Sequence, residues 1–212
     1  MKNNMDALSL LEEFKLVPVL VIDDAGTAVD LARCLQDAGI GALEITLRTP
    51  AALPAIEAIA KSVEGVLLGA GSIRQPGQFE SVKNAGASFA VSPGATDTLL
   101  DTAKKLFMPF VPGAVTPSEM LALFEKGYTL QKFFPAELSG GAPLLKAVSA
   151  PMPELRFFST GGINATLVTE YCKLANVVSI GGSWFAPADL IAEKKFSEIT
   201  EKAKEALSVF NS

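Results

Sequence analysis

The chain has 212 residues, of which 49% are hydrophobic and 19% are charged, so it can bury a sizeable core, most simply as a single domain over residues 1–212. Its formal net charge of -5 disfavours binding to nucleic acid or to an anionic membrane surface, because both attract basic patches. The absence of histidine excludes imidazole general bases, Ser-His-Asp triads and histidine-ligated metal sites.

Two further features concern the environment of the protein. No apolar stretch has the length of a membrane span, and the polar, acidic start lacks the apolar segment of a signal peptide, so we expect a cytoplasmic protein. Cys34 and Cys172 lie far apart in helix-like contexts without CxxC spacing. We therefore expect two separate reduced thiols in the core and no disulfide framework.

Short apolar or alternating segments, expected as strands, recur along the chain between longer segments with helical periodicity. The first, residues 16–22, is apolar throughout, which is typical of a strand buried on both faces in a parallel sheet. The expected strands, in chain order, are residues 16–22, 42–47, 66–68, 88–91, 109–111, 129–134, 155–158 and 177–180.

The segments between the strands carry start and stop signals of helices. Thr49-Pro50 supplies an N-cap followed by proline, and residues 116–119 (TPSE) form a capping box. Gly39, Gly86 and Gly127 follow three of the segments, as is typical of helix ends. The expected helices are residues 7–14, 27–38, 50–62, 76–85, 96–106, 117–126, 142–148, 165–174 and 196–209.

This alternation of strands and helices predicts βαβ units and a parallel sheet. A count of about eight strands indicates a (β/α)8 TIM barrel in one α/β domain, preceded by an extra N-terminal helix. A doubly wound open sheet is the alternative. In a barrel, functional side chains gather at the carboxyl ends of the strands.

The second expected strand alternates in character. Glu44, Thr46 and Arg48 share one face, and apolar residues share the other, so a carboxylate, a hydroxyl and a guanidinium would point into the barrel near its mouth. The alternative is a helix in which Glu44 and Arg48, four residues apart, form a surface ion pair.

A lysine stands among apolar residues in the sixth expected strand. Leu130, Lys132 and Phe134 would share one face of that strand. Removal of an ammonium group from water favours the neutral amine, a nucleophile that can form an imine with a carbonyl substrate. The alternative is an edge or loop lysine with its amine in solvent.

Glycine-rich loops follow three of the expected strands. Residues 69–72 (GAGS) superficially suggest a dinucleotide loop, but Arg74 occupies the place of the third glycine, and we expect small residues that admit a ligand. Residues 160–162 (TGG) and 181–183 (GGS) follow the seventh and eighth strands, where TIM barrels commonly hold a phosphate. The alternative is a pair of tight turns that merely require glycine.

Six short motifs occur in order along the chain: residues 43–49 (LEITLRT), 69–72 (GAGS), 92–94 (SPG), 132–137 (KFFPAE), 160–162 (TGG) and 181–184 (GGSW). Together they resemble the motifs of the bacterial KHG/KDPG aldolases. The resemblance extends over nearly the whole chain, from about Val17 to the final helix.

The resemblance implies a class I aldolase with a (β/α)8 fold, usually a homotrimer, without a metal or another cofactor. Its substrate would be the phosphorylated keto acid 2-keto-3-deoxy-6-phosphogluconate (KDPG), which is cleaved to pyruvate and D-glyceraldehyde 3-phosphate in the Entner-Doudoroff pathway. By the same resemblance, Lys132 is the Schiff-base lysine and Glu44 the general acid/base. The other implied contacts are Arg48, Ser72 and Pro93 around the pyruvate carboxylate, and Thr160, Gly161, Gly162, Gly182 and Ser183 at the phosphate end.

One departure from the family pattern is the serine at position 72, where threonine is common; the hydroxyl is kept and a methyl group is lost. Thr160 matches the gluconate-type enzymes. Two alternatives stay open at this point. One is an aldolase that acts mainly on 4-hydroxy-2-oxoglutarate (KHG) and releases glyoxylate and pyruvate, and the other is a non-catalytic barrel that binds a sugar phosphate.

Overall fold

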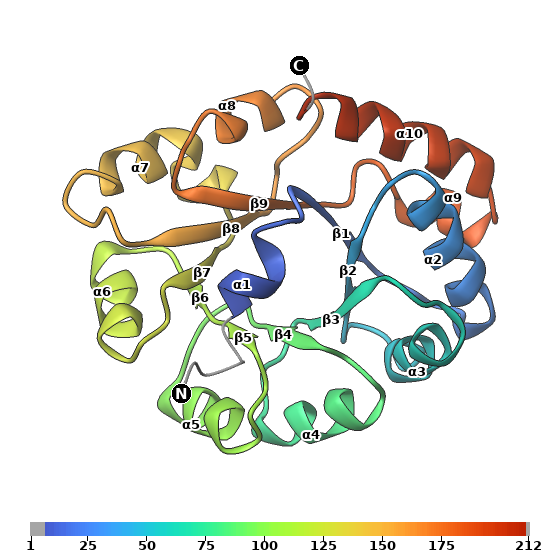
Figure 1. Ribbon diagram of the computed structural model, residues 1–212, viewed down its shortest axis with the longest axis horizontal. Helices are drawn as coiled ribbons and strands as arrows, with labels where there is room; N and C mark the ends of the chain where they lie inside the picture. The colour runs from blue at the N-terminus through green and yellow to red at the C-terminus, as the bar shows by residue number, and fades with distance from the viewer. Residues whose placement is uncertain (1–6, 211–212) are drawn as a thin grey trace.

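A single parallel sheet curls into a nearly closed barrel in the computed structural model, which describes residues 7–210 (Figure 1). Its strand order is β5-β4-β3-β2-β1-β9-β8-β7-β6, and each pair of neighbours for which a register is defined runs parallel. The strands are β1 Leu16–Leu20, β2 Ala42–Thr46, β3 Leu67–Gly71, β4 Phe89–Val91, β5 Phe110–Val111, β6 Gly113–Ala114, β7 Leu130–Phe133, β8 Arg156–Thr160 and β9 Val177–Gly182.

The fifth barrel strand is split in two, which explains nine strands where the sequence analysis expected about eight. Pro112 separates β5 from β6 and has no N–H group to donate to a neighbouring strand. Its carbonyl still accepts a hydrogen bond from the backbone N–H of Lys132 at 2.8 Å. The two pieces pair with β4 and β7 respectively, so the predicted (β/α)8 barrel is confirmed.

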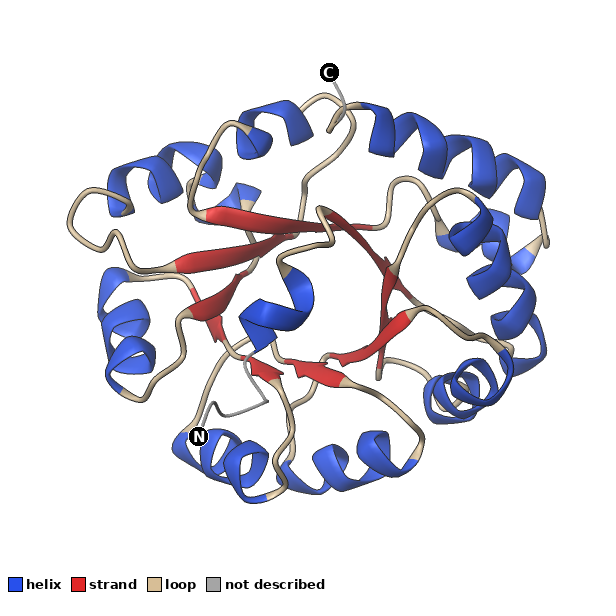
Figure 2. Cartoon of the chain, viewed as in Figure 1, coloured by secondary structure: helices blue, strands red, loops and turns tan. Residues whose placement is uncertain are grey.

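All of the described helices except the first surround the barrel, and the first lies across its opening, as Figure 2 shows by colour. The helices are α1 Ala7–Leu11, α2 Ala28–Asp37, α3 Ala52–Ser62, α4 Pro76–Asn84, α5 Asp97–Lys105, α6 Pro117–Glu125, α7 Gly141–Val148, α8 Val168–Cys172, α9 Ala188–Ala192 and α10 Phe196–Ser208. Two 3-10 turns, η1 Ala25–Thr27 and η2 Glu137–Ser139, complete the described elements. Among the described residues, no helix is both long enough and apolar enough to cross a membrane.

Several local predictions need correction. Thr49 is not the N-cap of α3; its hydroxyl donates to the carbonyl of Ile22, and the helix begins two residues later than expected. The eighth helix is shorter than residues 165–174, because the Asn164 side chain accepts hydrogen bonds from the next turn of backbone. The sequence analysis also missed α9. By contrast, the capping box of Thr116 and Glu119 is present as predicted.

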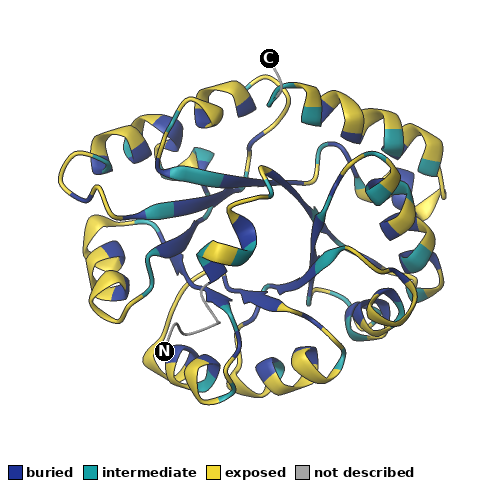
Figure 3. Cartoon of the chain, in the orientation of Figure 1, coloured by how far each residue is buried: buried dark blue, intermediate teal, exposed yellow. Residues whose placement is uncertain are grey.

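Apolar residues form two layers, one between the sheet and the helices and one inside the barrel. Figure 3 shows buried residues on the sheet and on the inward faces of the helices. Leu11 of α1 is fully buried with the interior layer, and its carbonyl accepts a hydrogen bond from Ser179 of β9 at 3.0 Å. Since only four residues separate α1 from the start of β1, α1 closes the amino-terminal end of the barrel. The carboxyl end is left for a site.

Both cysteines are free thiols, as expected. Neither is fully buried, and Cys34 is half-buried. Cys172 is exposed at the end of α8, so its assignment to the core was wrong. The reason is that α8 is a short surface helix whose buried face consists of Val168 and Tyr171.

Candidate active site

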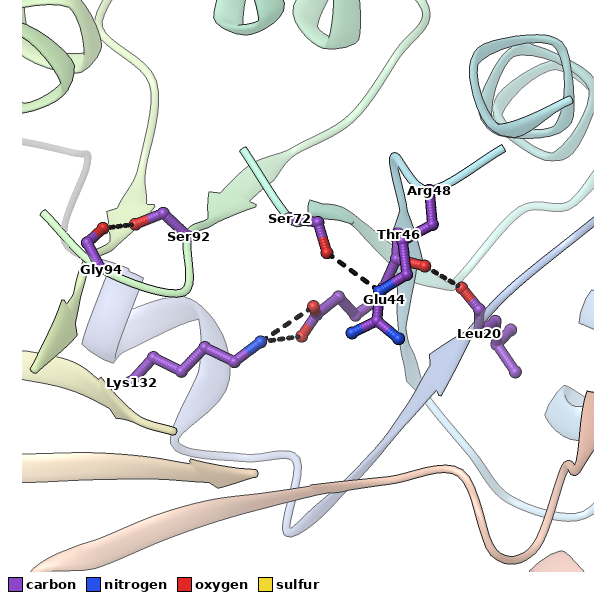
Figure 4. Close-up of polar contacts among 8 residues, drawn as sticks. All are labelled: Leu20, Glu44, Thr46, Arg48, Ser72, Ser92, Gly94 and Lys132. Carbon is purple, nitrogen blue, oxygen red and sulfur yellow. Dashed lines mark hydrogen bonds and ion pairs between the residues drawn. The ribbon is translucent and has the colours of Figure 1, made fainter. Parts of the chain in front are cut away.

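A lysine and a glutamate meet inside the barrel from different parts of the sheet. Lys132 Nζ lies 3.1 Å from Glu44 Oε1 and 3.4 Å from Oε2 (Figure 4). Glu44 comes from β2 and Lys132 from β7, and they are 0% and 5% exposed. Glu44 is therefore on a strand and not on a surface helix, and Lys132 is not a solvent-exposed edge lysine.

Two aromatic rings flank the amine. Lys132 Nζ lies 5.6 Å from the ring centre of Phe134 and 5.7 Å from that of Phe158, and Phe158 is also the neighbour of Lys132 in the register of β7 and β8. The rings exclude water while their negative faces favour a cation. A buried charge pair of this kind costs solvation on both sides, so it is weak evidence for stability and stronger evidence for a functional site.

Gly71, at the end of β3, makes room for the glutamate. A Cβ atom at this position would lie 1.9 Å from Glu44 Oε1 and 2.6 Å from its Cδ. The sequence analysis expected the small residues at 69–72 to admit a ligand, but at Gly71 the side chain of Glu44 occupies the space. A glycine at the carboxyl end of a strand signals that another group approaches the backbone closely. The sequence alone does not show that this group is the side chain of Glu44 on the neighbouring strand.

The other polar residues of β2 and its loop have different environments. Thr46 is fully buried, and its hydroxyl donates to the carbonyl of Leu20 at 2.9 Å, which ties β2 to β1. Arg48 lies beyond the end of β2 and is exposed; its Nε donates to Ser72 Oγ at 3.4 Å. Ser72 has φ +62° and follows β3 directly, so the hydroxyl meets the guanidinium at the barrel mouth.

A cavity of about 420 Å³ opens at this end of the barrel. Its wall combines Lys132 and Arg48 with both of the loops predicted to bind phosphate. The predicted residues on it are Arg48, Lys132, Thr160, Gly161, Gly162, Gly182 and Ser183. One elongated ligand can therefore reach the amine, the guanidinium and the glycine loops together.

The end of β8 has free hydrogen-bonding capacity. Thr160 Oγ1 is buried and, within the described residues, has no hydrogen-bond partner. Gly161 and Gly162 have φ +103° and +82°, a conformation that favours glycine. An unpaired buried hydroxyl is costly, so a ligand oxygen that pairs with Thr160 would gain affinity.

Pro93 is the predicted site residue that the structure sets apart. It is exposed and lies on the wall of a second cavity, of about 170 Å³, between the loop after β4 and α6. Of the predicted site residues, Glu44, Ser72 and Pro93 do not line the cavity of Lys132. The hydroxyl of the preceding Ser92 donates to the carbonyl of Gly94 at 2.5 Å, which closes a tight turn. The cavity of Lys132 also includes Trp184, to which the sequence analysis gave no role in the site.

Comparison with known proteins agrees with this geometry. The family model described as KDPG and KHG aldolase matches residues 8–202. The 2-dehydro-3-deoxy-phosphogluconate aldolase of Pseudoalteromonas atlantica is 47% identical over 91% of this chain and 90% of its own length. The KHG/KDPG aldolase of Escherichia coli strain K12 is 42% identical over 98% of both chains.

Among solved structures, this chain is similar to a KDPG aldolase from Legionella pneumophila in which pyruvate was captured at low pH as a covalent carbinolamine intermediate. The two share 41% sequence identity with a TM-score of 0.92, and the match covers 95% of this chain and 98% of the other.

Proposed function

The chain belongs to the KDPG and KHG aldolase family, and we propose that it is a class I aldolase that cleaves KDPG to pyruvate and D-glyceraldehyde 3-phosphate. The observation that carries this proposal is the buried pair of Lys132 and Glu44, whose side chains lie 3.1 Å apart, with Lys132 on the wall of a ligand-sized cavity. A nucleophilic amine beside a proton acceptor is what Schiff-base chemistry requires.

The first half of the reaction uses the amine. Lys132, once its proton has passed to Glu44, adds to the C2 ketone of the substrate and forms a carbinolamine. Glu44 then protonates the departing hydroxyl, water leaves, and a protonated imine remains. The close approach of the two side chains supports a direct transfer of the proton between them.

The second half breaks the carbon-carbon bond. A base removes the proton of the C4 hydroxyl, the C3–C4 electron pair moves into the imine, and the aldehyde product leaves with an enamine on Lys132. Protonation at C3 and hydrolysis release pyruvate and regenerate the amine. We assign both proton transfers to Glu44, acting through water where the distance requires it. No step calls for a metal or a redox cofactor.

The cavity suggests how the substrate lies. We propose that Arg48, whose planar guanidinium can donate two parallel hydrogen bonds, binds the carboxylate with help from Ser72, to which it is already hydrogen-bonded. Pro93 lines a different cavity, so we give it no direct contact with the carboxylate. The phosphate would lie at the opposite end, against Thr160 and the glycine loops at 161–162 and 182–183. The unpaired hydroxyl of Thr160 supports this orientation.

KHG is the second candidate substrate, because the Escherichia coli relative carries both substrates in its name. Cleavage of KHG would use the same imine chemistry and release glyoxylate and pyruvate. Two glycine loops beside an unpaired threonine hydroxyl favour the phosphorylated substrate, since KHG has no phosphate to place there.

We also propose a cytoplasmic homotrimer. Large apolar side chains exposed on the described surface support an interface between copies of the chain. They include Leu138, which is 90% exposed, and Leu121 and Phe124 of α6. Sedimentation equilibrium would return three times the 22.2 kDa chain mass if the trimer is correct.

Borohydride trapping tests the catalytic proposal directly. Incubation with pyruvate and borohydride should add a stable mass to the peptide that contains Lys132, and KDPG should be cleaved in the same preparation. A protein that binds the phosphorylated keto acid without being trapped would instead be a non-catalytic barrel. Parallel turnover of KDPG and KHG separates the two candidate substrates.

A further inference from the structure

A buried tyrosine and a glutamate are paired directly behind the glycine loop of the cavity. Tyr171, on α8, is 1% exposed, and its hydroxyl donates a hydrogen bond to Glu137 Oε1. Glu137 begins the turn η2, three residues after Phe134. Neither residue lines the cavity that contains Lys132, so the pair does not contact a ligand there.

Glu137 is in contact with the glycine loop through both its backbone and its side chain. Its N–H donates to the carbonyl of Gly161 at 3.0 Å, and the N–H of Ala136 donates to the carbonyl of Thr160 at 2.8 Å. A Cβ atom on Gly162 would lie 2.8 Å from Glu137 Cβ and 2.9 Å from Glu137 Cγ. The side chain of Glu137 thus packs against the loop, and a shift of Glu137 would shift the loop.

The same segment continues from the strand of the reactive lysine. β7 ends at Phe133, one residue after Lys132, and the chain reaches Glu137 four residues later. Segment 134–137 therefore connects the amine to the loop at the other end of the cavity. On its outer side, this segment is held by the hydrogen bond from Tyr171 of α8 to Glu137.

We propose that Tyr171, acting through Glu137, is a positioning residue. It holds the loop at 160–162 in a fixed position relative to Lys132 for substrates that carry a phosphate. The inference rests on the proposed function. Substrates without a phosphate make no use of the loop, so they should be insensitive to the pair. This differential effect separates a positioning role from a merely structural one.

The hydroxyl of Tyr171 remains a donor under any ordinary assay condition. Burial, together with the hydrogen bond to the Glu137 carboxylate, raises the pKa of Tyr171 well above its usual range. The bond to Glu137 therefore persists across the pH range in which an imine enzyme can be assayed, and its loss requires a substitution.

Tyr171→Phe removes only the hydroxyl and is the primary test. We expect KM for KDPG to rise at least fivefold with kcat within twofold, while kcat/KM for KHG and borohydride trapping of pyruvate stay within twofold. Tyr128→Phe is the matched control, since Tyr128 is the other tyrosine and its hydroxyl donates to the Leu100 carbonyl at 3.3 Å, away from the site. It should leave both substrates unchanged.

Variants of the acceptor complete the kinetic test. Glu137→Gln keeps an oxygen that accepts from Tyr171 and should behave like the parent protein, whereas Glu137→Ala should reproduce the KM effect of Tyr171→Phe. The double variant Tyr171→Phe/Glu137→Ala should have a KM for KDPG no higher than that of either single variant, because each single substitution already removes the same hydrogen bond. Equal losses on KDPG and KHG, or no loss on either, would overturn the inference.

A binding measurement distinguishes failure of this inference from failure of the proposed function. Trp184 is the single tryptophan of the chain and lines the cavity, so its fluorescence can be titrated with inorganic phosphate. We expect Tyr171→Phe to weaken the affinity for phosphate at least fivefold and Tyr128→Phe to leave that affinity unchanged, even if KDPG were not the substrate. A parent protein without a saturable response, or equal phosphate affinity in all variants, would overturn the positioning role.

Discussion

Lys132 Nζ lies 3.1 Å from Glu44 Oε1, although the two residues are 88 positions apart in the chain. The pair spans the barrel interior, with the amine on β7 and the carboxylate on β2. Each charge compensates the other in a site where neither would be stable alone. Removal of either partner should therefore disturb both the chemistry and the environment of the residue that is left.

Glu44→Gln keeps the shape of the side chain and removes its basicity. We expect turnover to fall by roughly two to four orders of magnitude, because a general acid/base contributes on that scale. Steady-state cleavage of KDPG measures the effect. Glu57→Gln is the control, since it removes an exposed carboxylate paired with Lys61 on α3 and should leave turnover unchanged. Near-normal rates in Glu44→Gln would remove this residue from the mechanism.

Lys132→Ala removes the nucleophile, so pyruvate and borohydride should add no mass to the protein. Mass spectrometry of the intact chain measures the result. Because the variant leaves the Glu44 carboxylate buried without its partner, we also expect a lower free energy of unfolding, by about 3–5 kcal/mol. Persistent trapping at another lysine of a folded variant would contradict the assignment.

Gly71→Ala tests the space around the carboxylate. The new Cβ would lie 1.9 Å from Glu44 Oε1, so the carboxylate must move away from Lys132. A misplacement of about 1 Å costs on the order of a hundredfold in rate. Gly77→Ala is the matched control, because nothing lies within 4 Å of its Cβ position in α4. If both variants retained full kcat, Gly71 would have no role in placing Glu44.

Arg48→Lys tests the proposed carboxylate contact. A lysine keeps the charge but loses the planar fork and its hydrogen bond to Ser72. We expect the pyruvate concentration for half-maximal trapping to rise roughly ten- to hundredfold, which corresponds to about 1.4–2.8 kcal/mol. Arg74→Lys, the same change at an exposed arginine after β3, is the control. An unchanged pyruvate dependence would mean that another group binds the carboxylate.

The two thiols should differ in reactivity. Burial raises the pKa of Cys34 to about 11, so at pH 8 it carries roughly a hundredfold less thiolate than an ordinary cysteine. Cys172 is exposed and should react first with a disulfide reagent. The variant Cys172→Ser should then show only the slow phase, which should accelerate as the pH rises toward 11. A fast phase in that variant would contradict the assignment.

Local patterns were enough to predict most elements of this fold. Alternation along β2 predicted an inward-facing Glu44, alternation along β7 placed Lys132 on one face with Leu130 and Phe134, and the recurring strand–helix units predicted a barrel. These features depend on residues close in sequence. The errors had two causes: the Thr49 hydroxyl donates to the carbonyl of Ile22, 27 positions away in the chain, and the fifth strand is divided at Pro112.

By itself, the sequence determined which side chains share a face of each expected strand and excluded imidazole chemistry, because side-chain periodicity and composition need no tertiary contacts. Only the tertiary structure decided which of these side chains meet. Barrel closure brings Lys132 to Glu44, places Gly71 against the carboxylate, puts Pro93 on a different cavity and pairs Tyr171 with Glu137. Such distances depend on how strands far apart in the chain pack, and no local pattern encodes that packing.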